Sequence, residues 1–125
     1  MTSEGQSYAG NKDTEAEYRR RATIRDLNDN LRRTMTGGRV MITNGIEALG
    51  LMKVTSILHG VRQFDDFSYA NDPFDEHDFG ALTWQGHRVF WKIDYYDKQL
   101  EFGSPDPADP GVTVRVITIM LASEY

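Results

Sequence analysis

Apolar residues recur at helical spacing in the first third of the chain. Thr14-Glu15-Ala16-Glu17 fits a capping box, in which the side chains of Thr14 and Glu17 satisfy free backbone N–H groups, so a helix should begin there. Gly37-Gly38 supplies a stop, and one apolar face is formed by Ile24, Leu27, Leu31 and Met35. The pattern predicts a helix from Thr14 to about Thr34.

A second apolar stripe follows in the middle of the chain. Helical spacing there predicts a helix from about Leu51 to Asp65, with the apolar positions Val54, Ile57, Leu58, Val61 and Phe64. Between the two helices, Arg39 to Thr43 has the composition of a short strand, and Asn44-Gly45 opens a turn or short helix through Leu49. Residues 66–78 are rich in Asp, with Ser, Asn and Pro, and are predicted to form a loop.

The period changes from helical to alternating after this loop. Phe79 to Trp84, the turn Gln85-Gly86 and His87 to Tyr96 predict a β-hairpin. Alternation assigns four residues of its second strand to the core: Val89, Trp91, Ile93 and Tyr95. A further turn at Asp97-Lys98 leads into a predicted short third strand, Gln99 to Phe102.

The C-terminal segment fits two structures. Gly103 to Gly111 is a proline-stiffened connector, and residues 112–123 are rich in β-branched side chains, which favours a strand. Helical spacing of Arg115, Thr118 and Ala122, preceded by Asp109-Pro110 as N-cap and first helical residue, favours a helix. We interpret residues 112–123 as a helix, with a strand as the alternative.

These elements predict one α+β domain over residues 14–125. Two N-terminal helices and a C-terminal helix would pack on a small antiparallel β-meander. Residues 1–13 carry too little apolar surface to offset the entropy of ordering and are expected to form a disordered tail.

Composition excludes several classes of protein. No apolar run approaches the roughly 18 to 20 residues of a membrane span, and the N-terminus lacks the basic and apolar regions of a signal peptide, so a cytoplasmic location is expected. The chain has no cysteine, which excludes disulfides, thiolate nucleophiles and cysteine-ligated metals. The P-loop and kinase motifs are incomplete, because TGGRV lacks the Gly-Lys-Ser/Thr ending and DFG has no accompanying phosphate loop.

Charge is unevenly distributed along the chain. Residues 1–64 have a net charge of +3 and residues 65–125 a net charge of −8, within a total of −5. An acidic surface disfavours direct binding to nucleic acid and suits a basic protein partner. Three arginines, Arg21, Arg25 and Arg32, fall on one flank of the first helix, where they would form a basic ridge. The alternative, which we favour, is a solvated face on which Arg25, Asp29 and Arg33 make i,i+4 ion pairs.

The stretch NDPFDEHDFG, residues 71–80, concentrates carboxylates around one histidine. Its carboxylates, with those of Asp65 and Asp66, would suffice for calcium or magnesium, but the spacing is not that of an EF-hand. His77 has no histidine or cysteine partner at zinc-site spacing, so no metal site and no cofactor are expected. An acid–base site would pair His77 with Asp78 or Glu76, and Tyr95, Tyr96 or Lys92 would be the second polar group.

Four long runs carry a family resemblance: IRDLNDNLRRTMTGGRVMIT, FDDFSYANDPFDEHDFG, FWKIDYYDKQLEFGSPDPADP and VTVRVITIMLASEY. Together they resemble the bacterial domain-of-unknown-function family number 3768, over about residues 22–125. The resemblance implies a small single-domain protein of a family often encoded on plasmids and integrated mobile elements. It implies no activity, fold or site.

A binding surface explains more of the sequence than a reactive site does. Aromatic groups among carboxylates can provide apolar anchors within a charged rim for a protein partner. We therefore expect a non-enzymatic protein-binding role, as an accessory of a mobile element, through Asp72, Phe74, Asp75, Glu76, His77, Asp78, Asp94 and Tyr96. The alternatives are an inhibitor of host defence with an acidic face that imitates nucleic acid, and an enzyme or metal-binding protein that uses the 71–80 loop.

Overall fold

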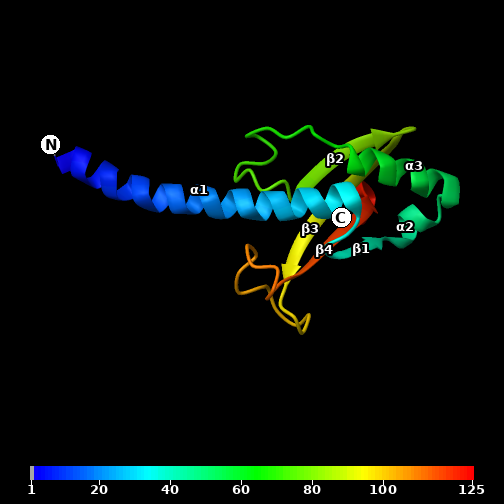
Figure 1. Ribbon diagram of the computed structural model, residues 1–125. Coiled ribbons are helices and arrows are strands. Elements are labelled where there is room, and N and C mark those ends of the chain that lie inside the picture. Colours follow the sequence, from blue (N-terminus) through cyan, green and yellow to red (C-terminus); the bar gives the residue numbers. More distant parts are fainter. Residues whose placement is uncertain (1) are drawn as a thin grey trace.

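The computed structural model describes the backbone of residues 2–125 and the side chains of residues 15–125. The described chain has an α+β fold (Figure 1). Its elements are α1 (Thr2–Thr34), β1 (Arg39–Ile42), α2 (Asn44–Glu47), α3 (Leu51–Arg62), β2 (Phe79–Trp84), β3 (His87–Tyr96), β4 (Val114–Leu121) and the 3-10 turn η1 (Ala122–Glu124). Of the helices in this part of the chain, none has both the length and the apolar character that crossing a bilayer requires.

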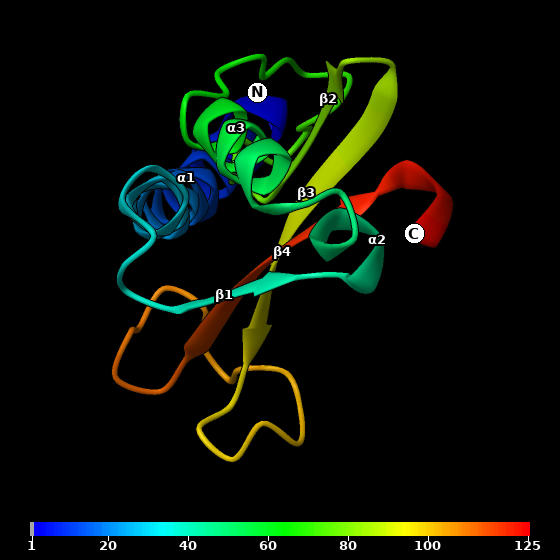
Figure 2. The same ribbon diagram turned by 90° about the vertical axis from the view of Figure 1, so that its right-hand side faces the viewer.

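The four strands form one sheet in the order β1-β4-β3-β2. β4 runs parallel to β1 and antiparallel to β3, and β3 runs antiparallel to β2, so the sheet is mostly antiparallel. α1 and α3 lie together on one side of the sheet (Figure 2). The core therefore lies between this helical layer and one face of the sheet.

Trp91 lies at the centre of the core. Its side chain is fully buried, and the rings of Phe64 and Phe67 meet its edge or face at centroid distances of 5.5 and 6.1 Å. Gly80 lies opposite Trp91 in the β2–β3 register, where a Cβ atom would collide with the indole, so only glycine fits there without a shift. The remaining buried core is aliphatic: Leu31, Ile46, Val54, Ile57, Val61, Val89, Ile93, Ile117 and Ile119.

The predicted hairpin is confirmed, with both strand ranges as expected. Val89, Trp91 and Ile93 are buried and Tyr95 is partly buried, as alternation requires. The end of the first helix at Thr34, the short strand after it and the helix beginning at Leu51 are also confirmed. α1 begins at Thr2 and not at Thr14, so its backbone is helical through the residues expected to form a tail. The side chains of the Thr14 capping box lie outside those that the structure describes.

The predicted C-terminal helix is wrong. Residues 114–121 form β4, which is paired with β1 on one side and β3 on the other. Alternate residues of β4, including Ile117 and Ile119, point into the core, and a strand buried in the middle of a sheet favours β-branched residues. Packing on two neighbouring strands therefore outweighs the helical spacing of Arg115, Thr118 and Ala122.

The predicted third strand over Gln99–Phe102 is also wrong. Asp97 Oδ1 accepts the backbone N–H of Glu101 at 3.0 Å, and Leu100 has a φ of 59°, so the chain turns here. In place of a strand, the segment has one isolated antiparallel β-bridge, between Tyr96 and Gly103.

Candidate functional site

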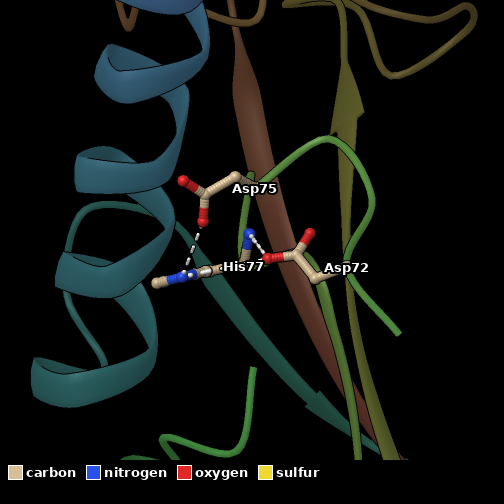
Figure 3. Close-up of side chains that lie close together, drawn as sticks. All are labelled: Asp72, Asp75 and His77. Atoms are coloured by element: carbon tan, nitrogen blue, oxygen red, sulfur yellow. Dashed lines mark hydrogen bonds and ion pairs between the residues drawn. The ribbon is translucent and has the colours of Figure 1, made fainter. Parts of the chain in front are cut away.

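The loop between α3 and β2, residues 63–78, folds back onto α1. The buried carboxylate of Asp72 organises it, because its two oxygens each accept a backbone N–H, from Glu76 and His77, both at 3.1 Å. Asp75 and His77 adopt positive φ angles of 55° and 56°, which non-glycine residues seldom adopt. Asp72, Asp75 and His77 thereby come together beside α1 (Figure 3). We call these three residues the Asp–Asp–His triad.

The imidazole of His77 is fixed from several sides. It stacks on Phe67 with a centroid distance of 3.7 Å and an interplanar angle of 6°. Nδ1 lies 2.8 Å from Asp29 Oδ1 of α1, while Nε2 lies 3.4 Å from Asp75 Oδ1 and 3.8 Å from Asp72 Oδ2. One imidazole thus faces three carboxylates from two elements.

A network of hydrogen-bonded polar side chains extends from this loop to β4. The Tyr95 hydroxyl lies 3.1 Å from Glu76 Oε1 and accepts an N–H of Asn28 at 2.8 Å, and Arg115 Nε donates to Asn28 Oδ1 at 2.6 Å. Arg115 also donates to the carbonyl of Pro107. Burial raises the pKa of the Tyr95 hydroxyl and lowers that of Arg115. This network attaches α1 to the loop, to β3 and to β4.

Arg32 provides a second attachment for α1. Its side chain is fully buried between the rings of Phe67 and Trp91, with the guanidinium carbon 5.4 Å from each centroid. It donates to Asp29 at 3.1 Å and to three carbonyls at the C-terminal end of α3 and just beyond it, those of Val61, Arg62 and Phe64. Arg32 is thus a structural cation, and Arg21, Arg25 and Arg32 do not form the basic ridge that was the less favoured interpretation of α1.

An open groove of about 620 Å³ separates the outer face of α1 from the 63–78 loop. The Arg21 guanidinium lies over the rings of Phe74 and Tyr18, at 5.2 and 6.0 Å, and Arg25 Nη1 lies 2.6 Å from Asp75 Oδ2. The groove, called the aromatic groove below, is lined by Tyr18, Arg21, Arg25, Tyr69, Pro73, Phe74 and Asp75.

The structure divides the surface predicted from the sequence. Phe74 and Asp75 line the aromatic groove, Asp72 and His77 lie behind it, and Glu76 contacts Tyr95. Asp94 and Tyr96 belong to β3 positions that alternate with its core residues, so they lie on the opposite face of the sheet. There Asp94 Oδ2 lies 3.1 Å from Lys92 Nζ, and this ion pair raises the pKa of Lys92.

The histidine does not pair as the acid–base interpretation expected. Its recorded side-chain partners are Asp29, Asp72 and Asp75, and neither Asp78 nor Glu76 is among them. Asp78 instead accepts the Ile93 N–H through its carbonyl at 2.8 Å. Burial raises the pKa of its carboxyl, and the charges of Glu76 and Asp72 add to this effect.

Comparison with known families gives one match. The family model described as "Protein of unknown function (DUF3768)" matches residues 42–124, which is most of the chain. The chain belongs to the DUF3768 family. Comparison with curated proteins and with solved structures gave no match. The resemblance on which membership was expected is thus confirmed for this DUF3768 protein, although the matched range excludes α1.

Several residues of the site could not be identified from the sequence of this DUF3768 protein. Asp29 lies 48 residues from His77, and Asn28 lies 67 residues from Tyr95. The sequence predicted that both residues lie on the first helix, but it did not predict how that helix is rotated relative to the loop. The one available signal was polar: Asn28 and Asp29 neighbour the apolar face that contains Ile24 and Leu31.

Proposed function

We propose that this DUF3768 protein acts by binding another protein and catalyses no reaction. The observation that carries the proposal is the aromatic groove, where Tyr69 is 85 % exposed and Phe74 59 % exposed beside two arginines. Tyrosine and arginine are enriched among the residues that contribute most to protein–protein binding. Exposed rings gathered around a groove, rather than scattered singly, are typical of interaction sites.

The groove favours a particular kind of partner segment. Exposed rings with Pro73 suit an apolar or proline side chain, and the guanidinium group of Arg21 suits a carboxylate beside it, whereas Arg25 is already paired with Asp75. We therefore propose an extended segment in which an apolar residue neighbours Asp or Glu. At this groove the charge of the partner is opposite to that of the basic partner expected from the sequence, because the carboxylates of Asp72, Asp75 and Glu76 already have partners within the domain.

The other candidate roles receive less support from the geometry. Imitation of nucleic acid needs carboxylates free to face a basic groove, whereas Asp72, Asp75 and Glu76 are bonded to the protein itself. A role as an accessory of a plasmid or other mobile element is part of the proposal and rests on the family resemblance alone.

Selection from a random peptide display library would test the groove. We expect the wild-type protein to enrich peptides with an apolar residue next to Asp or Glu. Tyr69→Ser and Phe74→Ser should each weaken binding of a selected peptide at least about tenfold, since truncating an anchor residue commonly costs 2 kcal/mol or more, roughly 30-fold.

Phe102→Ser is the matched control for these variants. Phe102 is 71 % exposed and lies in the turn after β3, outside the residues that line the groove. Its replacement should leave peptide binding unchanged. Peptides that bind all three variants as tightly as the wild type would refute the groove as the binding surface.

A further inference from the structure

We propose that Asp72, Asp75 and His77 form a binding site for a divalent transition-metal ion of the zinc type. Each residue offers one ligand atom, and these atoms lie within 4.8 Å of one another. Figure 3 shows the Asp75 carboxylate directed at the imidazole of His77 and the Asp72 carboxylate beside the backbone nitrogen of His77, next to α1. The site does not depend on peptide binding in the aromatic groove, and the two proposals are tested separately.

The histidine is prepared for metal binding by a residue of another element. Asp29 of α1 lies 2.8 Å from His77 Nδ1. A carboxylate accepts hydrogen bonds, so the proton of the neutral ring belongs on Nδ1, and the lone pair belongs to Nε2. A metal-bound histidine typically has this arrangement, with its second nitrogen donating to a carboxylate. The stack on Phe67 fixes the plane of the ring and so directs Nε2 towards the triad.

Both carboxylates are held with an oxygen facing Nε2. Arg25 binds Oδ2 of Asp75 at 2.6 Å and leaves Oδ1 at 3.4 Å from Nε2. Asp72 is 7 % exposed and fixed by two backbone N–H groups, with Oδ2 at 3.8 Å from Nε2. Ligands about 2.0 to 2.1 Å from a tetrahedral zinc ion lie roughly 3.4 Å from one another, so a small inward movement would complete the site.

An ion can reach the triad from solvent. A hollow of about 320 Å³ lies beside it and is lined by Phe67, Ser68, Tyr69, Asp72, Pro73 and Asp75. The three protein ligands leave the fourth tetrahedral position for water from this hollow. An imidazole with two carboxylates favours zinc and its neighbours over calcium and magnesium, which prefer all-oxygen sites.

Metal titration of tag-free protein, with Zn²⁺ in calorimetry and Co²⁺ in visible absorption, tests the proposal. We expect one ion per chain and the intense visible bands of tetrahedral cobalt. His77→Ala should abolish the site, and Asp75→Asn should weaken it at least about tenfold. Asp75 is suited to this test because its side chain is 67 % exposed, so the variant should fold. Asp29→Asn, which leaves all three ligands in place, should weaken binding about 10- to 100-fold.

The other two histidines of the chain, His59 and His87, provide matched controls. His59→Ala and His87→Ala should keep the wild-type affinity, stoichiometry and cobalt spectrum. The proposal is refuted by absence of binding at millimolar Zn²⁺, or by binding that survives both His77→Ala and Asp75→Asn. Loss of binding in a control variant together with retention in His77→Ala would refute it equally.

Discussion

A single buried cation, Arg32, connects the helical layer to the core. Its guanidinium satisfies three carbonyls at the end of α3 and the carboxylate of Asp29, while two aromatic rings enclose it. Burial lowers the pKa of Arg32, but arginine remains charged over the whole accessible pH range. The bonds to these neighbours, rather than the charge alone, make this position specific for arginine.

Arg32→Ala is predicted to lower the free energy of unfolding by about 3 to 5 kcal/mol. The substitution leaves the carbonyls of Val61, Arg62 and Phe64 without this donor and removes the cation paired with Asp29, which keeps His77 as a neighbour. Removing one member of a buried pair has costs of this size. Urea denaturation followed by circular dichroism measures the change. Arg32→Lys should recover only part of it, because an ammonium group cannot reproduce the planar fork of donors.

Arg33→Ala is the control for this prediction. Arg33 is the next residue of α1, its side chain is 59 % exposed, and its nitrogen lies 4.0 Å from Asp29. Exposed pairs contribute little, so the variant should unfold within about 0.5 kcal/mol of the wild type. Equal effects of the two substitutions would contradict a structural role specific to Arg32.

At the level of single residues, the sequence revealed charge but not burial. Three residues of the same type, Arg21, Arg25 and Arg32, lie on the same flank of α1. Arg32 is nevertheless buried, while Arg21 and Arg25 line the aromatic groove. Rotation of α1 about its axis by a fraction of a turn determines which arginine is buried and which is exposed. The contacts that set this rotation come from residues distant in the sequence. The same long-range contacts place Asp29 beside His77.

At the scale of elements, η1 joins the end of β4 to the start of α2 through one carboxylate. Glu124 accepts the hydroxyl of Thr43 at 2.6 Å and the backbone N–H groups of Leu121 and Gly45 at 2.9 and 3.0 Å. These bonds, that from Thr43 first, lower the pKa of Glu124. The carboxylate therefore binds the two chain segments more strongly in its ionised form than when it is protonated.

Glu124→Gln is predicted to lower the denaturation midpoint at pH 7, and the difference from the wild type should narrow in acid. A carboxyl whose pKa is lower in the folded than in the unfolded state stabilises the fold above the unfolded pKa of about 4.3. This contribution is lost as the pH falls through the folded pKa. Thermal denaturation of both proteins between pH 7 and pH 3 measures the change.

Glu101→Gln serves as the control, since Glu101 is an exposed residue of the turn after β3. Its denaturation midpoint should equal that of the wild type at every pH. If the midpoint of Glu124→Gln lies as far below that of the wild type at pH 3 as at pH 7, the stabilising role of the ionised Glu124 is contradicted.

Elements with one strong period were predictable, and those shaped by distant neighbours were not. The hairpin has alternation, a two-residue turn and β-branched and aromatic residues in agreement, so its ranges follow from local sequence. β4 has two partners, β1 and β3, that lie far from it in the chain, and its run of apolar residues is compatible with either a helix or a strand. Only these pairings decide for the strand.

At the scale of the whole molecule, the folded unit extends beyond the range that the family model matches. The match begins at residue 42, whereas α1 contributes Ile24, Leu31 and Arg32 to the buried interior. The second half of α1 is therefore part of the domain rather than an appendage to it.

Truncation should show this boundary. The chain 15–125 is predicted to unfold within about 0.5 kcal/mol of the full chain, because residues 1–14 are polar in sequence. The chain 38–125 should lack a cooperative transition, since it exposes the core face that α1 covers. Urea denaturation of both chains makes the comparison, and a cooperative transition of 38–125 at the full-length midpoint would contradict it.

The place of β4 in the sheet has a consequence for biosynthesis. This strand lies between β1 and β3, yet it ends only four residues before Tyr125. During translation the two strands that flank β4 are synthesised before it, and the sheet can close only after β4 itself has been synthesised. A premature stop before Val114 would therefore remove the middle of the sheet, and the unpaired edges of β1 and β3 would be free to pair with other nascent chains.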